Sequence, residues 1–313
     1  MQITDYSDCR KDLQMKNKKR GNEKVFFIVA GVIVALFALF CFMPILLVIS
    51  ASLTDEQALI ADGYRFIPSK FSLDAYTYLW RQNMMIARAY GISLFVSFFG
   101  TALGVAITAL AAYPLSRTSF KWRNLFTFLI FFTMLFNGGV VSSYMVWTRV
   151  FHIKNTIWAL VFPNYLVGAF NIILVKNYYQ NNIPVALVEA AKLDGATEMQ
   201  IFRKVMVPLS KPVIVTITMF SGLAYWNDWT NGLYYINKKE LFSVQLMLNE
   251  IQQNVMLLRT ANEKMGISIN QADIPSNGVR MAIAIIALLP IMIIFPIIQK
   301  ELIKGVVIGA VKG

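Results

Sequence analysis

Six long apolar runs alternate with polar segments of unequal length, and this alternation is the dominant pattern along the chain. A helix needs roughly 20 apolar residues to cross the hydrocarbon core of a bilayer. A spanning helix also satisfies its own backbone hydrogen bonds, which lipid cannot do. The pattern therefore predicts an all-α membrane protein with about six spans. The expected spans are residues 25–50, 89–115, 125–147, 157–175, 213–235 and 281–298.

Composition agrees with a bilayer as the main solvent. The 313 residues are 57% hydrophobic and only 15% charged, whereas a soluble domain has about 25% charged residues. The net charge of +12 would also suit a nucleic-acid-binding protein, but such a protein gathers its Lys and Arg on a soluble face. Here the basic residues lie between apolar runs. The first run lacks a small-residue cleavage site, so we expect it to be a retained span.

The distribution of Lys and Arg predicts the orientation in the membrane. Residues 1–24 carry seven of the 29 basic residues, and short basic segments stay in the cytoplasm. The segment 176–211 and both termini then face the cytoplasm. The expected division is a basic tail at 1–24, the first span with an external loop at 25–87, the main transmembrane domain at 88–298, and a cytoplasmic tail at 299–313.

Few residues offer catalytic or metal-binding chemistry. Cys9 and Cys41 lie in different segments, and His152 is the only histidine, so we expect no metal site and no disulfide. The phosphate-binding sequence Gly-x-x-x-x-Gly-Lys-Ser/Thr does not occur. The chain is therefore not expected to be an enzyme or to hydrolyse ATP itself. Asp228 is the single carboxylate within the spans, and a proton-relaying secondary transporter stays open on that ground.

The polar segment 184–212 has the pattern of two short helices around a turn. Asp194 and Gly195 form a turn dipeptide, and glycine adopts positive φ without strain. Thr197 is placed to cap the second helix, and Pro208 is placed to help end it. An amphipathic helix lying on the membrane surface is an alternative interpretation.

The same segment resembles the EAA loop of ATP-binding-cassette importer permeases. It contains Glu189-Ala190-Ala191, then Asp194-Gly195-Ala196, an aromatic residue at Phe202, and Pro208-Leu209 before Pro212. Residues 92–298 resemble the type I, MetI-like transmembrane domain of these permeases. Three further stretches resemble the maltose-type carbohydrate branch, including polysaccharide and lipo-oligosaccharide permeases of Gram-positive bacteria. They are Trp226-Asn227-Asp228-Trp229, Val244-Gln245-Leu246, and Phe295-Pro296 with the ending 304–313.

The resemblance implies a permease subunit in the bacterial cytoplasmic membrane that imports a sugar or oligosaccharide by alternating access. Its partners would be a second permease, two ATPase subunits and an extracytoplasmic solute-binding protein, with no nucleic acid. ATP and Mg²⁺ would bind the ATPase, and no cofactor would bind this chain. A permease for an amino acid or peptide is the alternative within this class. The residues implied in coupling to the ATPase are Glu189, Ala190, Ala191, Asp194, Gly195, Phe202, Pro208 and Leu209, with Phe202 as an apolar knob.

An aromatic and polar cluster in the fifth span is the candidate substrate site. At about 1.5 Å per residue, Asp228 lies roughly 24 Å from the start of that span. Aromatic faces suit sugar rings, and acids and amides suit their hydroxyl groups. An interfacial aromatic belt or polar side chains that tie helices together would also explain the cluster, and the latter applies to Asn164 and Asn171. The candidate substrate-binding residues are Tyr225, Trp226, Asn227, Asp228, Trp229 and, in the third span, Asn137.

Overall fold

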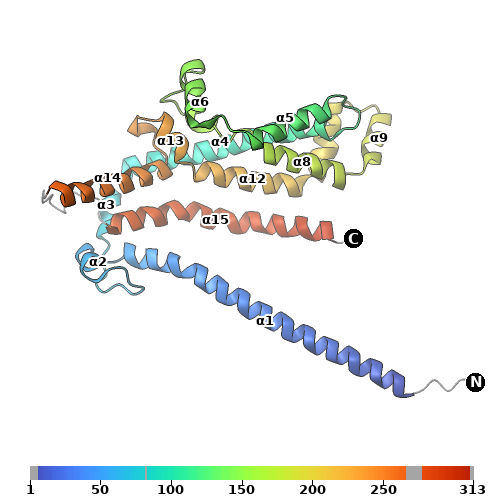
Figure 1. The fold of residues 1–313 in the computed structure, drawn as a ribbon, viewed down its shortest axis with the longest axis horizontal. Coiled ribbons are helices and arrows are strands. Elements are labelled where there is room, and N and C mark those ends of the chain that lie inside the picture. The colour runs from blue at the N-terminus through green and yellow to red at the C-terminus, as the bar shows by residue number, and fades with distance from the viewer. Residues whose placement is uncertain (1–5, 82, 266–276, 311–313) are drawn as a thin grey trace, which may run out of the picture.

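The computed structural model describes residues 6–81, 83–265 and 277–310. Within these ranges the chain is helical, and its β structure is one isolated bridge between Thr54 and Phe71. The long helices are α1 (Tyr6–Ser52), α4 (Asn83–Ser116), α12 (Lys211–Trp226) and α15 (Asn277–Ala310). Helices α4, α12 and α15 lie side by side, whereas α1 diverges from them towards its N-terminal end (Figure 1).

Shorter elements connect the long helices. Near the end of α1 lie α2 (Glu56–Asp62) and α3 (Asp74–Arg81), and α14 (Val244–Met265) precedes α15. The others are α5 (Arg123–Leu135), α6 (Gly139–Met145), η1 (Val146–Val150), α7 (Trp158–Val161), α8 (Ala169–Asn182), α9 (Val185–Leu193), α10 (Glu198–Ile201), η2 (Phe202–Met206), α11 (Val207–Leu209), α13 (Thr230–Tyr235) and η3 (Lys239–Leu241).

Three described helical stretches are long and apolar enough to cross a membrane: Phe26–Ser52, Met84–Ser116 and Asn277–Ile294. The number rises to five if each of two bent helix pairs forms one span. The first pair consists of α5 and the helical stretch Gly139–Val150, with a bend of 115° between them. The second pair consists of Glu198–Leu209 and α12, with a bend of 81° between them. The sequence thus predicts the positions of the spans better than their continuity.

The fourth expected span, 157–175, is interrupted in the structure. It is divided between α7 and α8, and neither is long enough to cross alone. Pro163 and Gly168 lie in the interruption, and Asn164 there has a φ of 67°. A left-handed residue beside a proline ends a right-handed helix, which explains the break.

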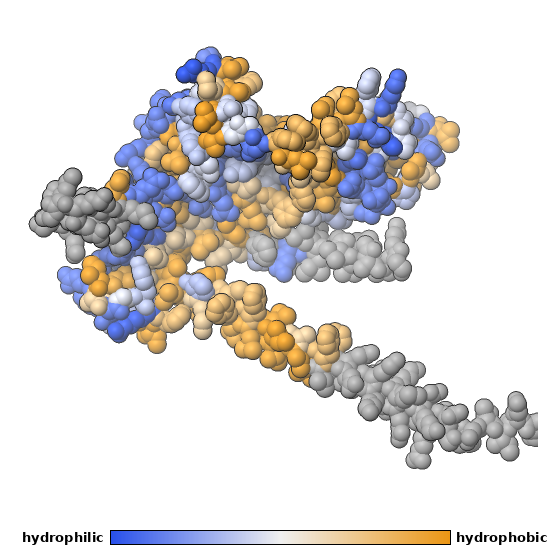
Figure 2. Space-filling view, viewed as in Figure 1, coloured by the Kyte–Doolittle hydropathy of each residue, from blue (hydrophilic) through white to orange (hydrophobic). Residues whose placement is uncertain are grey.

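Helix α1 is longer than expected and its apolar surface is uncovered. It begins at Tyr6, so residues 6–24 of the predicted tail continue the helix of the first span. None of its most apolar window is buried within the chain, and Figure 2 shows this part as a continuous hydrophobic surface. A helix that is apolar on all sides is stable only in lipid or against other apolar helices.

The start of α2 is attached to the start of α15 through Glu56. Its carboxylate accepts hydrogen bonds from the backbone N–H groups of Asn277 and Gly278 at 2.9 and 3.0 Å. The first N–H groups of a helix have no partner within the helix, and a carboxylate also suits the positive end of the helix dipole. Glu56 therefore supplies the N-terminal cap of α15 from another part of the chain.

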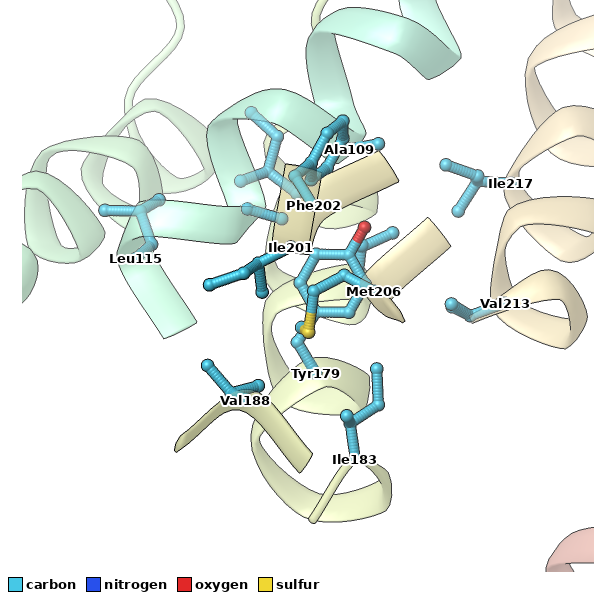
Figure 3. Close-up of a cluster of buried hydrophobic side chains, with 13 residues drawn as sticks. Ala109, Leu115, Tyr179, Ile183, Val188, Ile201, Phe202, Met206, Val213 and Ile217 are labelled. Carbon is cyan, nitrogen blue, oxygen red and sulfur yellow. The ribbon is translucent and has the colours of Figure 1, made fainter. Parts of the chain in front are cut away.

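The largest of three apolar clusters among the described residues lies where α4, α8, α12 and the segment 184–209 meet (Figure 3). The helices contribute side chains such as Ala112, Val175 and Ile217, all fully or almost fully buried. A well-packed cluster of this kind holds its elements at fixed distances. The predicted cytoplasmic segment is thus part of the folded domain rather than a loose loop.

Candidate functional site

The segment Pro184–Leu209, called the elbow below, begins with α9, and hydrogen bonds define where α9 ends. The backbone N–H of Ala196 donates to the carbonyl of Ala191, and the N–H of Gly195 donates to the carbonyl of Lys192, each at 3.0 Å. These two bonds form a Schellman motif, which needs a left-handed residue just after the helix. Gly195 occupies that position with a φ of 78°. The Asp194-Gly195 turn expected from the sequence is therefore confirmed.

The second half of the elbow begins with a capping box. The Thr197 hydroxyl accepts from the backbone N–H of Gln200 at 3.4 Å, and the Gln200 side chain accepts from the backbone N–H of Thr197 at 2.8 Å. Such reciprocal bonds satisfy two otherwise free N–H groups at the start of a helix. Cap and Schellman motif together fix the angle between α9 and α10.

Phe202 does not form the exposed knob that the resemblance implied. Its side chain is only 8% exposed, and its ring contacts Tyr113 of α4 edge-on, with ring centroids 5.4 Å apart. Figure 3 shows Ile201, Phe202 and Met206 pointing into the cluster between α4, α8 and α12. The helix places these residues on one inward face, and Phe202 therefore attaches the elbow to the spans instead of presenting itself to a partner.

A network of polar side chains attaches the elbow to the C-terminal end of α4. The Lys192 ammonium lies 2.7 Å from the Glu198 carboxylate, which also accepts a hydrogen bond from the Tyr113 hydroxyl. Arg117 in turn donates to that hydroxyl at 3.2 Å. The bonds from Lys192 and Tyr113 lower the pKa of Glu198 below its ordinary value. Tyr113 and Arg117 were not predicted, because an Arg four residues after a Tyr on a spanning helix gives no separate signal.

The outer side of the elbow carries exposed apolar side chains. Leu193 is 89% exposed and Met199 is half exposed. Most of the residues implied in coupling lie on this exposed side, whereas Ala191 packs against the cluster. The exposed ones are Glu189, Ala190, Asp194, Gly195, Pro208 and Leu209. Their contact with an ATPase stays a prediction.

In the candidate substrate cluster, three of the predicted side chains are buried in helix contacts. The Tyr225 hydroxyl donates to the carbonyl of Val161 at 2.8 Å, and the Trp226 indole donates to the carbonyl of Ala287 at 3.1 Å. Asp228 is 5% exposed, and its carboxylate accepts from the backbone N–H groups of Thr230 and Asn231 at 3.0 and 3.1 Å. These bonds cap α13 and tie helices together, which was one of the alternatives to sugar contact.

A second buried polar group joins the interrupted helices. Asn231 is fully buried; its amide nitrogen donates to the carbonyl of Pro163 at 3.1 Å, and its oxygen accepts from Asn164 at 2.7 Å. Asn171 similarly donates to the Ser221 hydroxyl at 3.4 Å. Asn164 and Asn171 are thus confirmed as polar links between helices, which is a common use of amides in membrane proteins.

The remaining predicted substrate residues stay exposed at helix breaks. Asn227 and Trp229 flank the buried Asp228 between α12 and α13. Asn137 lies at the 115° bend between α5 and α6, where its side chain accepts from the backbone N–H of Gly139 at 2.9 Å. The sequence Asn137-Gly138-Gly139 thus marks a true opening of the third predicted span. Of the six candidates, these three have exposed side chains, and their contact with a substrate stays a prediction.

Comparison with known proteins gives the family. The sequence pattern of the binding-protein-dependent transport system inner membrane component matches residues 104–307, which is well over half of the chain. The chain belongs to this family of transport permeases. It is therefore a transport subunit and not an enzyme, and the fold is the MetI-like importer fold that the elbow sequence implied.

The permease is similar to several named bacterial proteins. It is 35% identical over 278 residues to the polygalacturonan/rhamnogalacturonan transport system permease protein YtcP of Bacillus subtilis, covering 89% of this chain and 95% of that one. It is 36% identical over 271 residues to the protein LplC of the same organism, covering 87% and 89%. A solved bacterial ABC transporter that imports the acidic polysaccharide alginate has a chain with a TM-score of 0.74 and 27% identity, covering 89% and 97%.

Proposed function

We propose that this permease forms, with a second permease, the membrane pathway of an ATP-driven importer of oligosaccharides. Its partners are two ATPase subunits, which bind ATP and Mg²⁺, and an extracytoplasmic solute-binding protein. The relatives that are named for transport of polygalacturonan/rhamnogalacturonan and of the acidic polysaccharide alginate support a carbohydrate rich in uronic acids. The observation that carries the proposal is the elbow, a fixed helical corner whose inner side packs on the spans and whose outer side is apolar and exposed.

The elbow suits transmission of movement from an ATPase. Its outer residues Leu193 and Met199 offer an apolar contact for a groove in a partner. Its inner residues attach it to α4 through Phe202 and Tyr113. Packed clusters move as rigid bodies rather than deforming, so closure of the ATPases tilts α4 and α12 together.

The same arrangement supports the orientation proposed from the basic residues. The N-terminal end of α1, the C-terminal end of α15 and the elbow lie towards the same end of the molecule (Figure 1). With the ATPase inside the cell, both termini face the cytoplasm. The helix breaks at Asn137 and Asn227 then lie towards the outer side, where an oligosaccharide would enter.

The test is assembly and transport with a charged residue placed on the outer side of the elbow. Leu193→Asp should prevent co-purification of the ATPase subunits and abolish uptake, because burying an unpaired carboxylate in an apolar contact is costly. Leu257→Asp is the matched control, since Leu257 is also exposed but lies on α14. Normal ATPase binding by the Leu193 variant would overturn the coupling role. Uptake that needs an ion gradient and no ATPase would favour a secondary transporter instead.

The proposed substrate class has its own test. The purified solute-binding partner should bind galacturonate-containing oligosaccharides more tightly than neutral ones of equal length. Uptake of both by reconstituted transporter follows the same order. Equal binding of neutral and acidic sugars would leave the importer assignment intact and reject only the uronate preference.

A further inference from the structure

The loop after α2 folds back along the last turn of the first span. Residues 63–73, called the return loop below, run from the end of α2 to the start of α3. The Ser50 hydroxyl donates to the carbonyl of Arg65 at 2.6 Å. The Asp55 N–H donates to the carbonyl of Lys70, and the Ser72 N–H donates to the carbonyl of Leu53, each at 2.9 Å. Since Ser50 lies within α1, the return loop lies level with the end of the span.

The return loop exposes large apolar side chains where a soluble loop carries polar ones. Ile67 is 80% exposed. The lobe formed by α2 and this loop shows hydrophobic patches beside hydrophilic residues (Figure 2). The other exposed apolar residues of the loop are Tyr64, Phe66, Phe71 and Leu73.

The charged groups of the return loop are paired with acids beside it. Arg65 lies 3.3 Å from Asp62, and Lys70 lies 3.3 Å from Asp55. Each basic side chain in the loop therefore has a carboxylate partner. Paired charges enter the polar headgroup layer at lower cost than single ones, because each carries its counter-charge with it.

The exposed loop residues lie next to the candidate membrane span of α1. The stretch Phe26–Ser52 has 27 residues, which at about 1.5 Å per residue gives about 40 Å, more than the roughly 30 Å of hydrocarbon. The last turn of α1 therefore lies at the level of the headgroups. Leu46 and Ile49 near that end of α1 are exposed like the loop, so one apolar surface passes from the helix to the loop.

We infer that the return loop is a membrane-interface anchor that inserts Phe66, Ile67 and Phe71 between the lipid headgroups. Aromatic and aliphatic side chains at this depth gain burial while the paired charges and backbone stay hydrated. The anchor fixes the tilt of α1, which packs on α15 and whose most apolar window is uncovered within the chain. This inference depends on the membrane-spanning family fold and not on the identity of the transported sugar.

Spin labelling of the assembled transporter in phosphatidylcholine vesicles tests the anchor. Ile67→Cys is made in a chain with Cys9 and Cys41 replaced by serine, and Phe71→Cys provides a second site. The labels should be several-fold more accessible to oxygen, which concentrates in lipid, than to a water-soluble nickel chelate. Lys239→Cys is the control, because Lys239 is exposed on η3; its label should show the opposite order.

Each alternative gives a distinct result. Greater accessibility to nickel at both loop sites would place the loop in water and overturn the anchor. Low accessibility to both reagents would show that protein covers the loop, either the second permease or the solute-binding protein, and would overturn it equally. Because the loop's charges are paired, replacing part of the lipid by phosphatidylglycerol should leave the oxygen accessibility unchanged.

Discussion

The conformation of Gly195 should decide whether the elbow can pass on movement. Its φ of 78° belongs to the left-handed region, and both bonds of the Schellman motif depend on it. A Cβ added there would meet no atom within 4 Å. Replacement of Gly195 therefore strains the backbone without a clash of the added Cβ within this chain.

The expected effect of a replacement at position 195 can be estimated from the cost of the left-handed conformation. An L-residue in the left-handed conformation costs about 1–2 kcal/mol, whereas asparagine tolerates it better because its side chain bonds locally. Such an energy changes a conformational equilibrium by a factor of roughly 5–30. Gly195→Val should therefore open the turn between α9 and α10 in a substantial fraction of molecules, and Gly195→Asn should have a smaller effect.

The assay is substrate-stimulated ATP hydrolysis and uptake by the complete transporter in vesicles. Gly195→Val should reduce both at unchanged membrane insertion, and Gly195→Asn should retain most of the activity. Gly91→Ala is the matched control, because Gly91 is in helix α4 and also has no atom within 4 Å of an added Cβ. Wild-type coupling by the valine variant, at equal assembly, would refute the requirement for this turn.

Three further changes test the packing around the pathway. Gly100→Ala would place a Cβ 2.5 Å from the ring of Tyr225; overpacking should cost about 1–3 kcal/mol and lower the thermal unfolding temperature, unlike the Gly91 control. Asn231→Leu leaves the buried carbonyl of Pro163 and the amide of Asn164 without their hydrogen bonds and should cost about 1–3 kcal/mol, whereas Asn227→Leu, at an exposed position, should cost less in the same measurement. Glu198 has a lowered pKa, so its ion pair stabilises the folded elbow above the ordinary value of 4.5 and is lost as the pH falls through the lower folded value. Protection of the elbow from proteolysis should fall in that range in the wild type and stay constant in Glu198→Gln.

Local signals in the sequence predicted the elbow well. Asp194-Gly195 followed by Thr197 specifies a helix end and a helix start within four residues, and both motifs form as expected. Such capping contacts are made between near neighbours, so they can be predicted without knowledge of the tertiary structure. The direction of Phe202 could not, because a short apolar face shows only which residues lie together and not which element they meet.

The same limit explains the candidate substrate cluster. An acid and three aromatic residues in one span fit a sugar site and a structural link equally well in the sequence. The choice depends on Val161 and Ala287, whose carbonyl groups receive bonds from the cluster and which lie about 60 residues away. A backbone carbonyl so far away in the sequence cannot be identified as a hydrogen-bond acceptor from the sequence alone. The burial of Tyr225 and Trp226 could therefore be recognised only from the fold.

The positions of the helix breaks connect the elbow to the proposed pathway. Helix α12 begins at Lys211, beside the elbow, and ends at Trp226, beside the break at Asn227. It has 16 residues, so it carries a displacement over about 24 Å. Its far end is held to α7 and α13 by buried bonds to Val161 and within the Asp228 turn. We therefore expect a tilt imposed at the elbow to move the exposed residues Asn227 and Trp229, and the proposed pathway to open where the helices are already interrupted.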